Sequence, residues 1–496
     1  MPRNLSAGGW DHAAGRSVRA PWLGWSLTVA GCVCLAIGPA FAEDWPQFRG
    51  PDARGVSEAE RPLPTEFSLE QNLLWSVELG PGIASPVISG QRVITTAMSG
   101  AEEFAVIALD RSTGRELWRR AFATGPLPAI TLPNNHASST PATDGRRVFV
   151  HFCTLGLLAL DIETGEVAWQ LKLDEPHYLM DWGAAASPIV YDNLVIFCQD
   201  DDLSPFLIAV DSQTGRIRWR TERPEMLAGY ALPVICEVAG RHELIVAGTG
   251  KLKGYDPATG QELWTCNTLV RTIMTSPVVR DGVIYISVQS YGDTDRVLKS
   301  ALLEWKDTNQ DGVLARDEVP PAFAERFAKG DANGDGRLEG DEIDRAFQAP
   351  SNMVGGGSII QAIRAGGSGD VTATHLLWNL KNRAPSNLAS PLLVGDQLFV
   401  VKRGGLSSSF DAATGEKHWE IKRINNLGEY YASPVAGDGK IYVTGENGFV
   451  VVLAAGAELQ ILAKNDLGGT CIATPAIADG RLYFRTTEKL LCFGLK

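Results

Sequence analysis

The sequence predicts an all-β protein, an eight-bladed β-propeller of four-stranded antiparallel blades, with a small α-helical EF-hand pair inserted in blade five. Three observations predict this fold. A short phrase ending in tryptophan recurs along the chain, a proline recurs at regular spacing, and two twelve-residue acidic loops interrupt one of the repeats. Units of about 45 residues with four short apolar runs are typical of propeller blades, in which each sheet covers the face of its neighbour.

The recurring phrase reads Asp, two residues, Thr-Gly, three residues and Trp. It stands at residues 110–118, 161–169, 211–219, 256–264 and 411–419. Asp and Thr-Gly favour a tight hydrogen-bonded turn, which we expect between the third and fourth strands of each blade. The tryptophan is expected on the outer strand, wedged into the seam with the next blade, where it buries a large apolar surface.

A proline marks the start of each unit, after a small or apolar residue and before an apolar strand. The eight prolines are Pro86, Pro141, Pro188, Pro233, Pro277, Pro391, Pro434 and Pro475. Their spacing is regular except for one long gap between Pro277 and Pro391. Eight prolines imply eight blades, and the gap predicts an excursion within blade five.

The two ends of the repeat are expected to share one blade. The last unit, residues 471–494, has inner strands but no terminal tryptophan strand. The strand expected at 73–79, with Trp75, comes before the first proline and has no inner strands of its own. It should complete blade eight and close the ring, which removes the exposed sheet edge.

The expected parts follow from these boundaries. In order they are a signal peptide at 1–42, an N-terminal extension at 43–72, blades one to five with the closing strand of blade eight at 73–291, the EF-hand pair at 292–356, and the rest of blade five with blades six to eight at 357–496. In blade five we expect the third strand at 358–364 and Trp378 on the fourth.

The amino terminus resembles an export signal. A basic region precedes an apolar run at 22–37, and Ala-Phe-Ala at 40–42 gives the small-x-small cleavage pattern. We expect cleavage before Glu43. The alternatives are a membrane anchor, for which the run is short, and lipidation at Cys32, beyond which the apolar stretch continues. The mature protein is therefore expected to be exported, periplasmic or extracellular, with no transmembrane anchor after signal cleavage.

Composition limits the partners and the redox chemistry. The net charge of −13 argues against a nucleic-acid partner. An exported protein can form disulfides, but their connectivity cannot be read from a sequence. Because the cysteines after the signal sit mostly in apolar strand patterns, we expect several of them to be small buried residues. They are Cys153, Cys198, Cys236, Cys266, Cys471 and Cys492.

Two loops in the blade-five excursion match the twelve-residue EF-hand pattern, in which oxygen ligands stand at positions 1, 3, 5, 7 and 12. The predicted ligands are Asp307, Asn309, Asp311, Val313 and Glu318 in the first loop, and Asp331, Asn333, Asp335, Arg337 and Glu342 in the second. Val313 and Arg337 would contribute backbone carbonyls. We therefore expect two calcium ions in a mainly structural role, with tighter binding in the second loop because Glu339 adds negative charge at position 9.

The residues around these loops predict helix–loop–helix–loop–helix. Apolar residues at 297–305 share one helical face, and Phe323 and Phe327 are spaced to pack at i,i+4. Leu314 and Leu338 stand at position 8 of the two loops, where paired EF-hand loops contact each other.

The Asp-x-x-Thr-Gly-x-x-x-Trp phrase resembles the repeat of the pyrroloquinoline-quinone (PQQ) propeller superfamily. That superfamily includes quinoprotein alcohol dehydrogenases and the propeller lipoprotein of the outer-membrane β-barrel assembly machinery. The resemblance covers residues 73–496, and the opening at 44–51 resembles secreted bacterial members of the PQQ-like group. It implies the propeller fold, but a fold does not specify an activity.

The resemblance also implies a test for enzymatic function. Quinoprotein dehydrogenases stack PQQ in the channel, often against a disulfide between adjacent cysteines, and bind calcium there. After the signal this chain has no adjacent cysteines, and its clear calcium ligands lie in the insert. Both departures weaken the enzyme hypothesis, so PQQ is not favoured as a cofactor.

Our first hypothesis is therefore a binding or scaffold protein that holds a protein or polymer ligand at the propeller face. The alternatives are a PQQ-dependent oxidoreductase with its site in the channel, and a carbohydrate-active enzyme. The sequence assigns no catalytic residue. Weaker candidate positions for a ligand are 134–136, 177–178 with 181–182, 200–202 and 430–431, for which turn capping, aromatic packing or a solvated turn is the simpler interpretation.

Overall fold

The computed structural model describes residues 43–270, 273–290, 298–347, 357–381, 388–425 and 427–495. The predicted signal, its cleavage motif and Cys32 lie outside the described residues. Contacts divide the chain into two units, Met1–Phe41 and Ala42–Lys496. Every element below belongs to the second unit.

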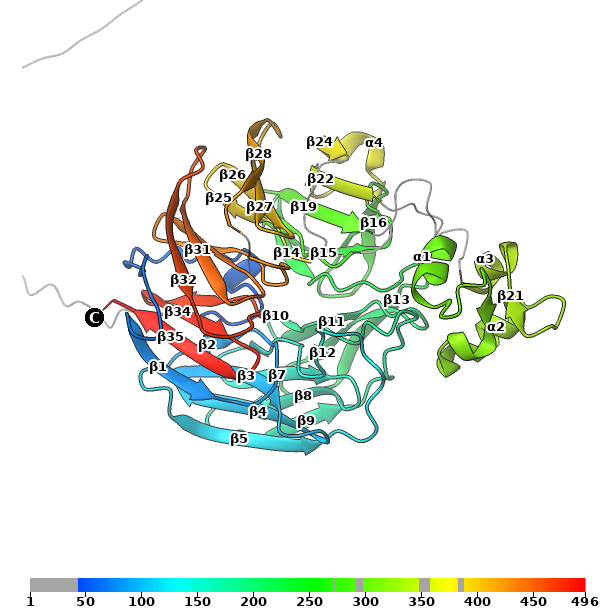
Figure 1. Ribbon diagram of the computed structural model, residues 1–496, viewed down its shortest axis with the longest axis horizontal. Coiled ribbons are helices and arrows are strands. Elements are labelled where there is room, and N and C mark those ends of the chain that lie inside the picture. The colour runs from blue at the N-terminus through cyan, green and yellow to red at the C-terminus, as the bar shows by residue number, and fades with distance from the viewer. Residues whose placement is uncertain are drawn as a thin grey trace, which may run out of the picture. The chain divides into compact units, whose positions relative to one another are not determined.

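Eight four-stranded antiparallel sheets form the propeller, as predicted (Figure 1). Blade one consists of β2 (Val87–Ser89), β3 (Arg92–Met98), β4 (Glu103–Asp110) and β5 (Glu116–Ala123), and blade two of β6 (Ala142–Thr143), β7 (Arg147–Phe152), β8 (Gly156–Asp161) and β9 (Val167–Leu171). Blade three consists of β10 (Ile189–Tyr191), β11 (Leu194–Gln199), β12 (Phe206–Asp211) and β13 (Ile217–Glu222), and blade four of β14 (Val234–Val238), β15 (Arg241–Gly248), β16 (Lys251–Tyr255) and β17 (Glu262–Cys266).

The remaining blades follow the same order. Blade five consists of β18 (Val278–Arg280), β19 (Val283–Ser290), β22 (Gly357–Arg364) and β24 (Leu376–Lys381), and blade six of β25 (Leu392–Val394), β26 (Gln397–Lys402), β27 (Leu406–Asp411) and β28 (Lys417–Arg423). Blade seven consists of β29 (Val435–Gly437), β30 (Lys440–Thr444), β31 (Phe449–Ala454) and β32 (Ile461–Asp466), and blade eight of β33 (Ala476–Ala478), β34 (Arg481–Arg485), β35 (Lys489–Gly494) and β1 (Leu73–Glu78).

The ring closes as the sequence predicts. Strand β1 pairs antiparallel with β35, with Trp75 opposite Cys492 and Glu78 opposite Lys489. Blade eight therefore takes its outer strand from the start of the propeller and its inner strands from the end. One feature was not expected, since the short strand β23 (Gly369–Asp370) adds to blade four in parallel with β17.

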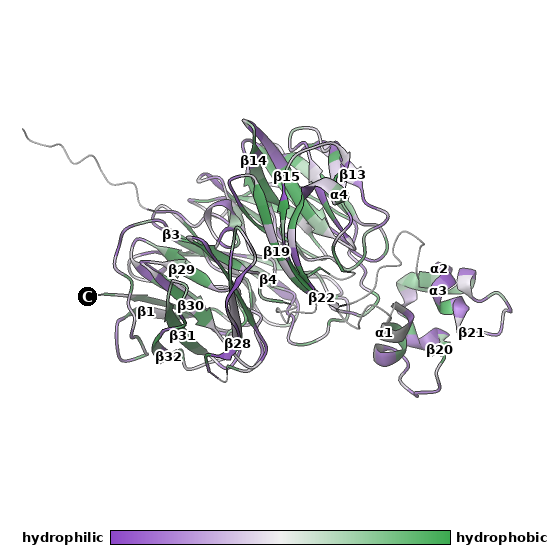
Figure 2. Ribbon diagram, turned by 90° about the horizontal axis from the view of Figure 1, so that it is seen from above, coloured by the Kyte–Doolittle hydropathy of each residue, from purple (hydrophilic) through white to green (hydrophobic). Residues whose placement is uncertain are grey.

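The inner strands carry the core. Strands β4 and β8 are almost entirely buried, whereas the outer strands β5 and β9 alternate between partly buried and exposed residues. Hydrophobic residues accordingly concentrate in the strands, and polar residues in turns and outer edges (Figure 2). Stacked blades cover both faces of each inner strand, which explains their continuous apolar runs.

The recurring phrase builds the turn that the sequence predicts. Between β4 and β5, Asp110 Oδ1 accepts hydrogen bonds from the Thr113 backbone N–H at 2.9 Å and from the Thr113 hydroxyl at 2.7 Å. The Ser112 hydroxyl, which donates to the same oxygen at 2.6 Å, and these Thr113 bonds lower the pKa of Asp110 to about 2. The following Gly114 has a φ of +73°, and a Cβ there would lie 2.7 Å from the ring of Trp75.

That glycine is where the preceding blade docks. The tryptophan of one blade lies over the Thr-Gly turn of the next, and its indole N–H donates to the carbonyl of the residue after Asp. Each of these hydrogen bonds is 2.9–3.1 Å long, and they join Trp75 to Arg111, Trp118 to Ile162, Trp169 to Ser212, Trp219 to Pro257 and Trp378 to Ala412. The predicted role of tryptophan as a seam wedge is confirmed at these five seams.

At two seams the indole N–H is bonded differently, although Trp264 and Trp419 still belong to hydrophobic clusters that include residues of the following blade. Trp264 and Trp419 carry the phrase, but the blade that follows each of them lacks it. Trp264 donates instead to Glu243 Oε2 of its own blade at 2.8 Å, and Trp419 donates to Ser407 Oγ of its own blade at 3.2 Å. Without a Thr-Gly turn to receive the ring, the indole turns inward.

The N-terminal extension crosses the end of the ring. Trp45 forms a β-bridge with Ile88 in blade one, and Val56 forms one with Ala436 in blade seven. Between them lies the short 3-10 helix η1 (Pro51–Ala53). The extension therefore ties together blades that are distant in the sequence.

The insert has the predicted order of helices and loops. Its elements are α1 (Leu298–Trp305), β20 (Leu314–Ala315), η2 (Arg316–Glu318), η3 (Pro321–Phe323), α2 (Ala324–Gly330), β21 (Arg337–Leu338) and α3 (Asp341–Phe347). Strands β20 and β21 pair with Leu314 opposite Leu338, which confirms the predicted contact between the loops. A further short helix, α4 (Thr372–His375), lies in blade five.

The insert shares its core with a propeller loop. Leu302, Phe323 and Phe327 form one hydrophobic cluster with Leu179 and Met180, from the connection between blades two and three. Lys306 forms an ion pair with Asp181 in the same connection. We call residues 177–182 the mouth loop, because its last residue lines the cavity described next.

Within the described part of the chain, the six cysteines are all buried and none forms a disulfide. The expectation that several are small buried residues is confirmed. No helix among the described residues is both long enough and apolar enough to cross a membrane.

Candidate functional site

The residue before each blade proline faces the channel. Proline restricts its predecessor to extended conformations, so all eight positions have a similar backbone. The eight residues are Ser85, Thr140, Ser187, Leu232, Ser276, Ser390, Ser433 and Thr474. All of them except Leu232 are Ser or Thr. All eight line one cavity with a volume of about 390 Å³. We call the seven hydroxyl residues the hydroxyl ring.

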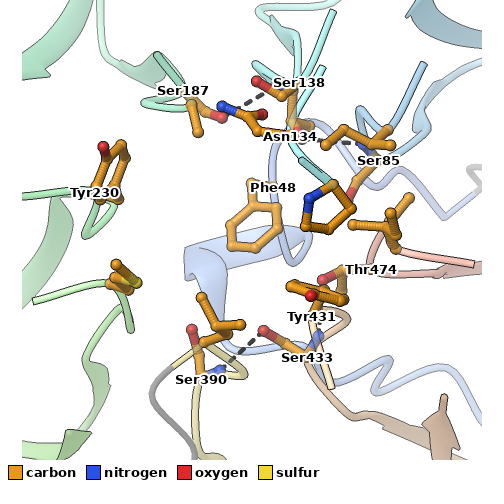
Figure 3. Close-up of a pocket in the computed structure, with 18 of the residues that line it drawn as sticks. Phe48, Ser85, Asn134, Ser138, Ser187, Tyr230, Ser390, Tyr431, Ser433 and Thr474 are labelled. Carbon is orange, nitrogen blue, oxygen red and sulfur yellow. Dashed lines mark hydrogen bonds between the residues drawn. The ribbon is translucent and has the colours of Figure 1, made fainter. Parts of the chain in front are cut away.

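Hydrogen bonds run around this ring from blade to blade. The backbone N–H of Thr140 donates to Ser187 Oγ at 2.9 Å, and that of Ser390 donates to Ser433 Oγ at 3.0 Å (Figure 3). Equivalent bonds join Ser85 to Thr140, Leu232 to Ser276, Ser276 to Ser390 and Ser433 to Thr474. Leu232 cannot accept such a bond, because its side chain is apolar. Six of the seven hydroxyls, all but that of Ser85, are therefore positioned by a backbone N–H of the neighbouring blade.

Aromatic residues complete the cavity. Phe48 projects into the middle of the ring from the N-terminal extension, with Tyr230 and Tyr431 around it (Figure 3). Trp182 and Leu132 also line the cavity. The walls thus combine hydroxyl groups with aromatic faces.

Arg49 anchors the segment that presents Phe48. Its side chain is fully buried, and Nη2 donates to the carbonyls of Pro391 at 2.5 Å and Arg54 at 3.2 Å. Burial lowers the pKa of Arg49 to about 9. On the other side of Phe48, the carbonyl of Pro46 accepts the backbone N–H of Thr143 at 2.9 Å. Phe48 is therefore held in the cavity from both sides.

None of the described residues that line the cavity is charged. One lining hydroxyl lacks any partner in the described structure, since the Tyr230 hydroxyl is buried without a hydrogen bond. Burial and the nearby carboxylates of Asp201 and Asp202 raise the pKa of Tyr230 well above its ordinary value. The phenol is therefore a neutral hydrogen-bond donor at physiological pH.

The structure separates the weaker candidates. Asn134 lines the cavity, and its Nδ2 donates to the carbonyl of Trp182 at 2.6 Å, which holds the mouth loop. Tyr431 also lines the cavity. Tyr178 is stacked on Tyr230 with ring centroids 5.2 Å apart, which confirms aromatic packing between blades.

The interpretation of residues 200–202 as a solvated turn is wrong. Asp200, Asp201 and Asp202 are all buried, with exposures of 2%, 0% and 6%. Arg223 forms a two-point ion pair with Asp200, with distances of 2.7 and 2.8 Å. Arg223 is itself buried, so its guanidinium needs this carboxylate partner.

The other two carboxylates hold the mouth loop. Asp201 Oδ2 accepts the backbone N–H of His177 at 3.0 Å, and Asp202 Oδ2 accepts that of Leu179 at 2.8 Å. Burial raises the pKa of Asp202 to about 6, although these hydrogen bonds oppose the shift. The acidic triplet is therefore a structural support for one wall of the cavity.

The predicted calcium ligands lie apart from this cavity, in the two insert loops. In the first loop, the segment between α1 and β20 contains Asp307, Asn309, Asp311 and Val313, and η2 ends at Glu318. In the second loop, the segment between α2 and β21 contains Asp331, Asn333 and Asp335, β21 begins at Arg337, and α3 contains Glu342. Among the described residues, no three His, Cys, Asp or Glu side chains are arranged around a metal position.

The two loops nevertheless have the same internal geometry. The carboxylate at position 1 accepts the N–H at position 6, from Gly312 to Asp307 at 2.8 Å and from Gly336 to Asp331 at 3.0 Å. The carboxylate at position 12 accepts the N–H at position 9 in both loops, at 2.9 Å for Glu318 and 3.3 Å for Glu342. Their carboxylates are thus held at matching positions.

Sequence reasoning missed the hydroxyl ring and Phe48. The recurring Ser-Pro and Thr-Pro dipeptides are the signal in the sequence that could have predicted the hydroxyl ring. Phe48 lies in a segment with no repeat, so nothing local places it in the channel.

The fold and the cavity define a PQQ-like β-propeller whose channel is lined, among the described residues, by hydroxyl, aromatic and other uncharged side chains. A family model described as "Outer membrane protein assembly factor BamB" matches residues 70–183 and 103–319, which together cover half of the chain. The chain belongs to this PQQ-like repeat family.

Individual relatives are distant. The chain is 25% identical over 269 residues to the outer membrane protein assembly factor BamB of Yersinia pestis, and the match covers 49% of this chain and 63% of that protein. It is 28% identical over 153 residues to the quinohemoprotein alcohol dehydrogenase ADH IIB of Pseudomonas putida, covering 30% of this chain and 21% of that protein. The chain therefore matches less than two thirds of the length of these relatives.

A solved structure supports the fold alone. The crystal structure of BamB from Moraxella catarrhalis superposes with a TM-score of 0.54 at 16% identity, covering 86% of this chain and 97% of that one.

Proposed function

We propose that this protein is an exported scaffold that binds a protein partner at the channel face of the propeller. The observation that carries the proposal is the cavity itself, which is open to a ligand yet has no charged residue among its described lining. Enzyme sites normally need titratable groups for proton transfer or covalent chemistry. Similarity to proteins named as outer membrane protein assembly factors supports export and a protein partner.

The alternative is a PQQ-dependent oxidoreductase with its site in the channel, and similarity to a quinohemoprotein alcohol dehydrogenase is its support. The residues present do not fit the cofactor well. PQQ is a tricarboxylate, and burying its charges without cations is unfavourable. The described lining offers no Lys, Arg or His, and the described cysteines are free rather than paired.

We also propose that the insert binds two calcium ions through the ligands named above. Calcium prefers carboxylate, amide and carbonyl oxygens, and each loop supplies that set at positions 1, 3, 5, 7 and 12. The matching geometry of the two loops supports this assignment, as does the burial of Asp307 and Glu342, each 8% exposed. Bound calcium would compensate the charge of these carboxylates.

The second loop is expected to bind more tightly than the first. Arg337 Nη2 donates to Asp311 Oδ2 at 2.6 Å, so a cation in the first loop must compete with a guanidinium for one of its ligands. Dissociation constants of about 10⁻⁴–10⁻³ M are usual for extracellular calcium modules. This range favours a structural role for the insert over a sensory one.

One experiment compares the two functions directly. The purified mature protein is incubated with PQQ and calcium, and bound quinone absorbance and dye reduction by alcohols or sugars are measured. In parallel, the protein is used with a cross-linker to capture partners from the exported fraction, with and without a calcium chelator. We expect a cross-linked protein partner and no turnover. Quinone binding with turnover would establish the alternative.

A further inference from the structure

We infer that the hydroxyl ring and the aromatic walls bind an uncharged, proline-rich segment of a partner protein. This inference rests on the proposed scaffold function, because it names the chemistry of the partner at the same site. The cavity volume of about 390 Å³ lies within the range of ligand pockets in proteins.

The ring presents donors to the cavity. A hydroxyl can accept hydrogen bonds and donate one proton. The oxygens of Ser187, Ser390 and Ser433 each accept a backbone N–H from the neighbouring blade, and these residues are at most 8% exposed. In the described structure none of the ring hydroxyls donates to another residue. Their protons are therefore available to a molecule in the cavity.

Two other groups strengthen this excess of donors. Tyr230 is one of the lining residues, and its buried hydroxyl has no hydrogen-bond acceptor in the described structure. The best side-chain acceptor in the lining, Asn134 Oδ1, already accepts the backbone N–H of Asn135 at 2.7 Å. A complementary ligand must therefore offer more acceptors than donors.

The absence of charge in the described lining then narrows the class of ligand. An anion has surplus acceptors, but it would meet no cation among the described lining residues, and burying an unpaired charge is costly. A saccharide also offers acceptors, but each of its hydroxyls adds a donor to a cavity that already has donors in excess. A proline-rich peptide has carbonyl acceptors, lacks N–H groups at its prolines and carries no charge.

The aromatic walls fit the same ligand. Proline-rich segments in the polyproline II conformation dock into grooves lined by aromatic side chains, and they lose little entropy on binding because their conformation is preformed. Phe48, Trp182 and Tyr431 line the cavity together with the hydroxyl ring. The cavity thus combines hydrogen-bond donors for peptide carbonyls with aromatic side chains that proline rings can contact.

The test uses calorimetric titration of the mature full-length chain in calcium-containing buffer. The probe is acetyl-Gly-Pro-Pro-Pro-Gly-amide. Comparison ligands are acetyl-Gly-Ala-Ala-Ala-Gly-amide, acetyl-Gly-Glu-Pro-Glu-Gly-amide and maltotriose. We expect the proline peptide to bind about tenfold more tightly than the alanine peptide, and the charged peptide and the saccharide not to bind. Saccharide binding without peptide binding, or equal affinity for the alanine and proline peptides, would overturn the inference.

A matched pair of variants places the peptide. Ser85→Ala removes a cavity-lining hydroxyl that, among the described residues, accepts no backbone N–H from a neighbouring blade, so affinity should fall about three- to tenfold, as expected for one hydrogen bond. Ser287→Ala removes a buried serine hydroxyl that has no hydrogen bond in the described structure, but Ser287 does not line the cavity. It should leave the affinity unchanged. Equal effects of both variants would place the peptide elsewhere.

The outcome also separates this inference from the scaffold function. If the protein captures a partner that the proline peptide does not displace, the inference fails while the scaffold function stands. If the peptide binds in the cavity but cross-linking captures no partner, the scaffold function fails while the binding site stands.

Discussion

The propeller and the insert are stabilised in different ways. Five blades donate a tryptophan indole N–H to the turn of the next blade, and six ring hydroxyls accept a backbone N–H from the previous blade. The core of the insert instead includes Leu179 and Met180 of the mouth loop, and Lys306 forms an ion pair with Asp181. Contacts between blades therefore follow from short repeated sequence motifs, whereas the contacts of the insert with the propeller depend on a few side chains of the mouth loop.

The largest expected effect lies in the propeller. Arg223→Ala should destabilise the protein by about 3–5 kcal/mol, because it leaves the buried Asp200 carboxylate without its partner. Urea unfolding followed by circular dichroism measures the change. The matched control is Arg218→Ala, whose more exposed pair with Asp211 should contribute about 0–1 kcal/mol. Similar losses for both variants would contradict a special role for the buried pair.

The next largest effect is a pH dependence of the propeller's stability against unfolding, which we do not expect for the insert. Because the pKa of Asp202 is raised to about 6 in the fold, the native state binds a proton more strongly than the unfolded chain does. This contribution is present below about pH 4 and is lost as the pH rises through 6, which amounts to about 3 kcal/mol. In Asp202→Asn, the urea midpoint should vary less between pH 4.5 and 7. An unchanged pH profile would show that Asp202 titrates normally.

Calcium should act on the insert and barely on the ring. At calcium concentrations about 100-fold above the dissociation constant, the insert should gain about 2.7 kcal/mol against local unfolding. Asp307→Ala combined with Asp331→Ala should abolish stoichiometric binding while leaving the β content nearly intact. Calorimetry and far-UV circular dichroism measure the two outcomes. Global unfolding of the double variant in calcium-replete buffer would show that the insert is integral to the ring.

The smallest effect concerns the junction of the two regions. Lys306→Ala removes the ion pair with Asp181, in which the two side chains are 15% and 33% exposed. We expect a loss below about 1 kcal/mol. Faster hydrogen exchange should appear in both residues 298–347 and the mouth loop. Lys329→Ala, at an exposed position of α2, is the control. Equal exchange in both variants would show that the ion pair does not dock the insert.

Much of the ring could be predicted because its signals are local. The phrase from Asp110 to Trp118 contains its own turn, and the prolines count the blades. Ring closure by Trp75 followed from a strand without partners. The order of helices in the insert and the contact of Leu314 with Leu338 followed from the twelve-residue loop pattern.

The rest depends on contacts between distant segments. Nothing near Asp200 in the sequence shows that Arg223 will fold onto it, which is why the prediction of a solvated turn fails. Trp264 has the full phrase, but its orientation depends on whether the next blade has one as well. Phe48 reaches the channel only because the extension crosses the ring. These features became visible only when several blades were considered together.

The indole bond across the seams has a consequence for interchangeability. Blades one to four each receive the tryptophan of the preceding blade through a Thr-Gly turn. A duplicated copy of blade two or three would therefore carry both halves of the joint that it needs. Blade five lacks the Thr-Gly turn, so it receives no indole hydrogen bond from Trp264 of blade four. The insert lies within this same blade, between β19 and β22.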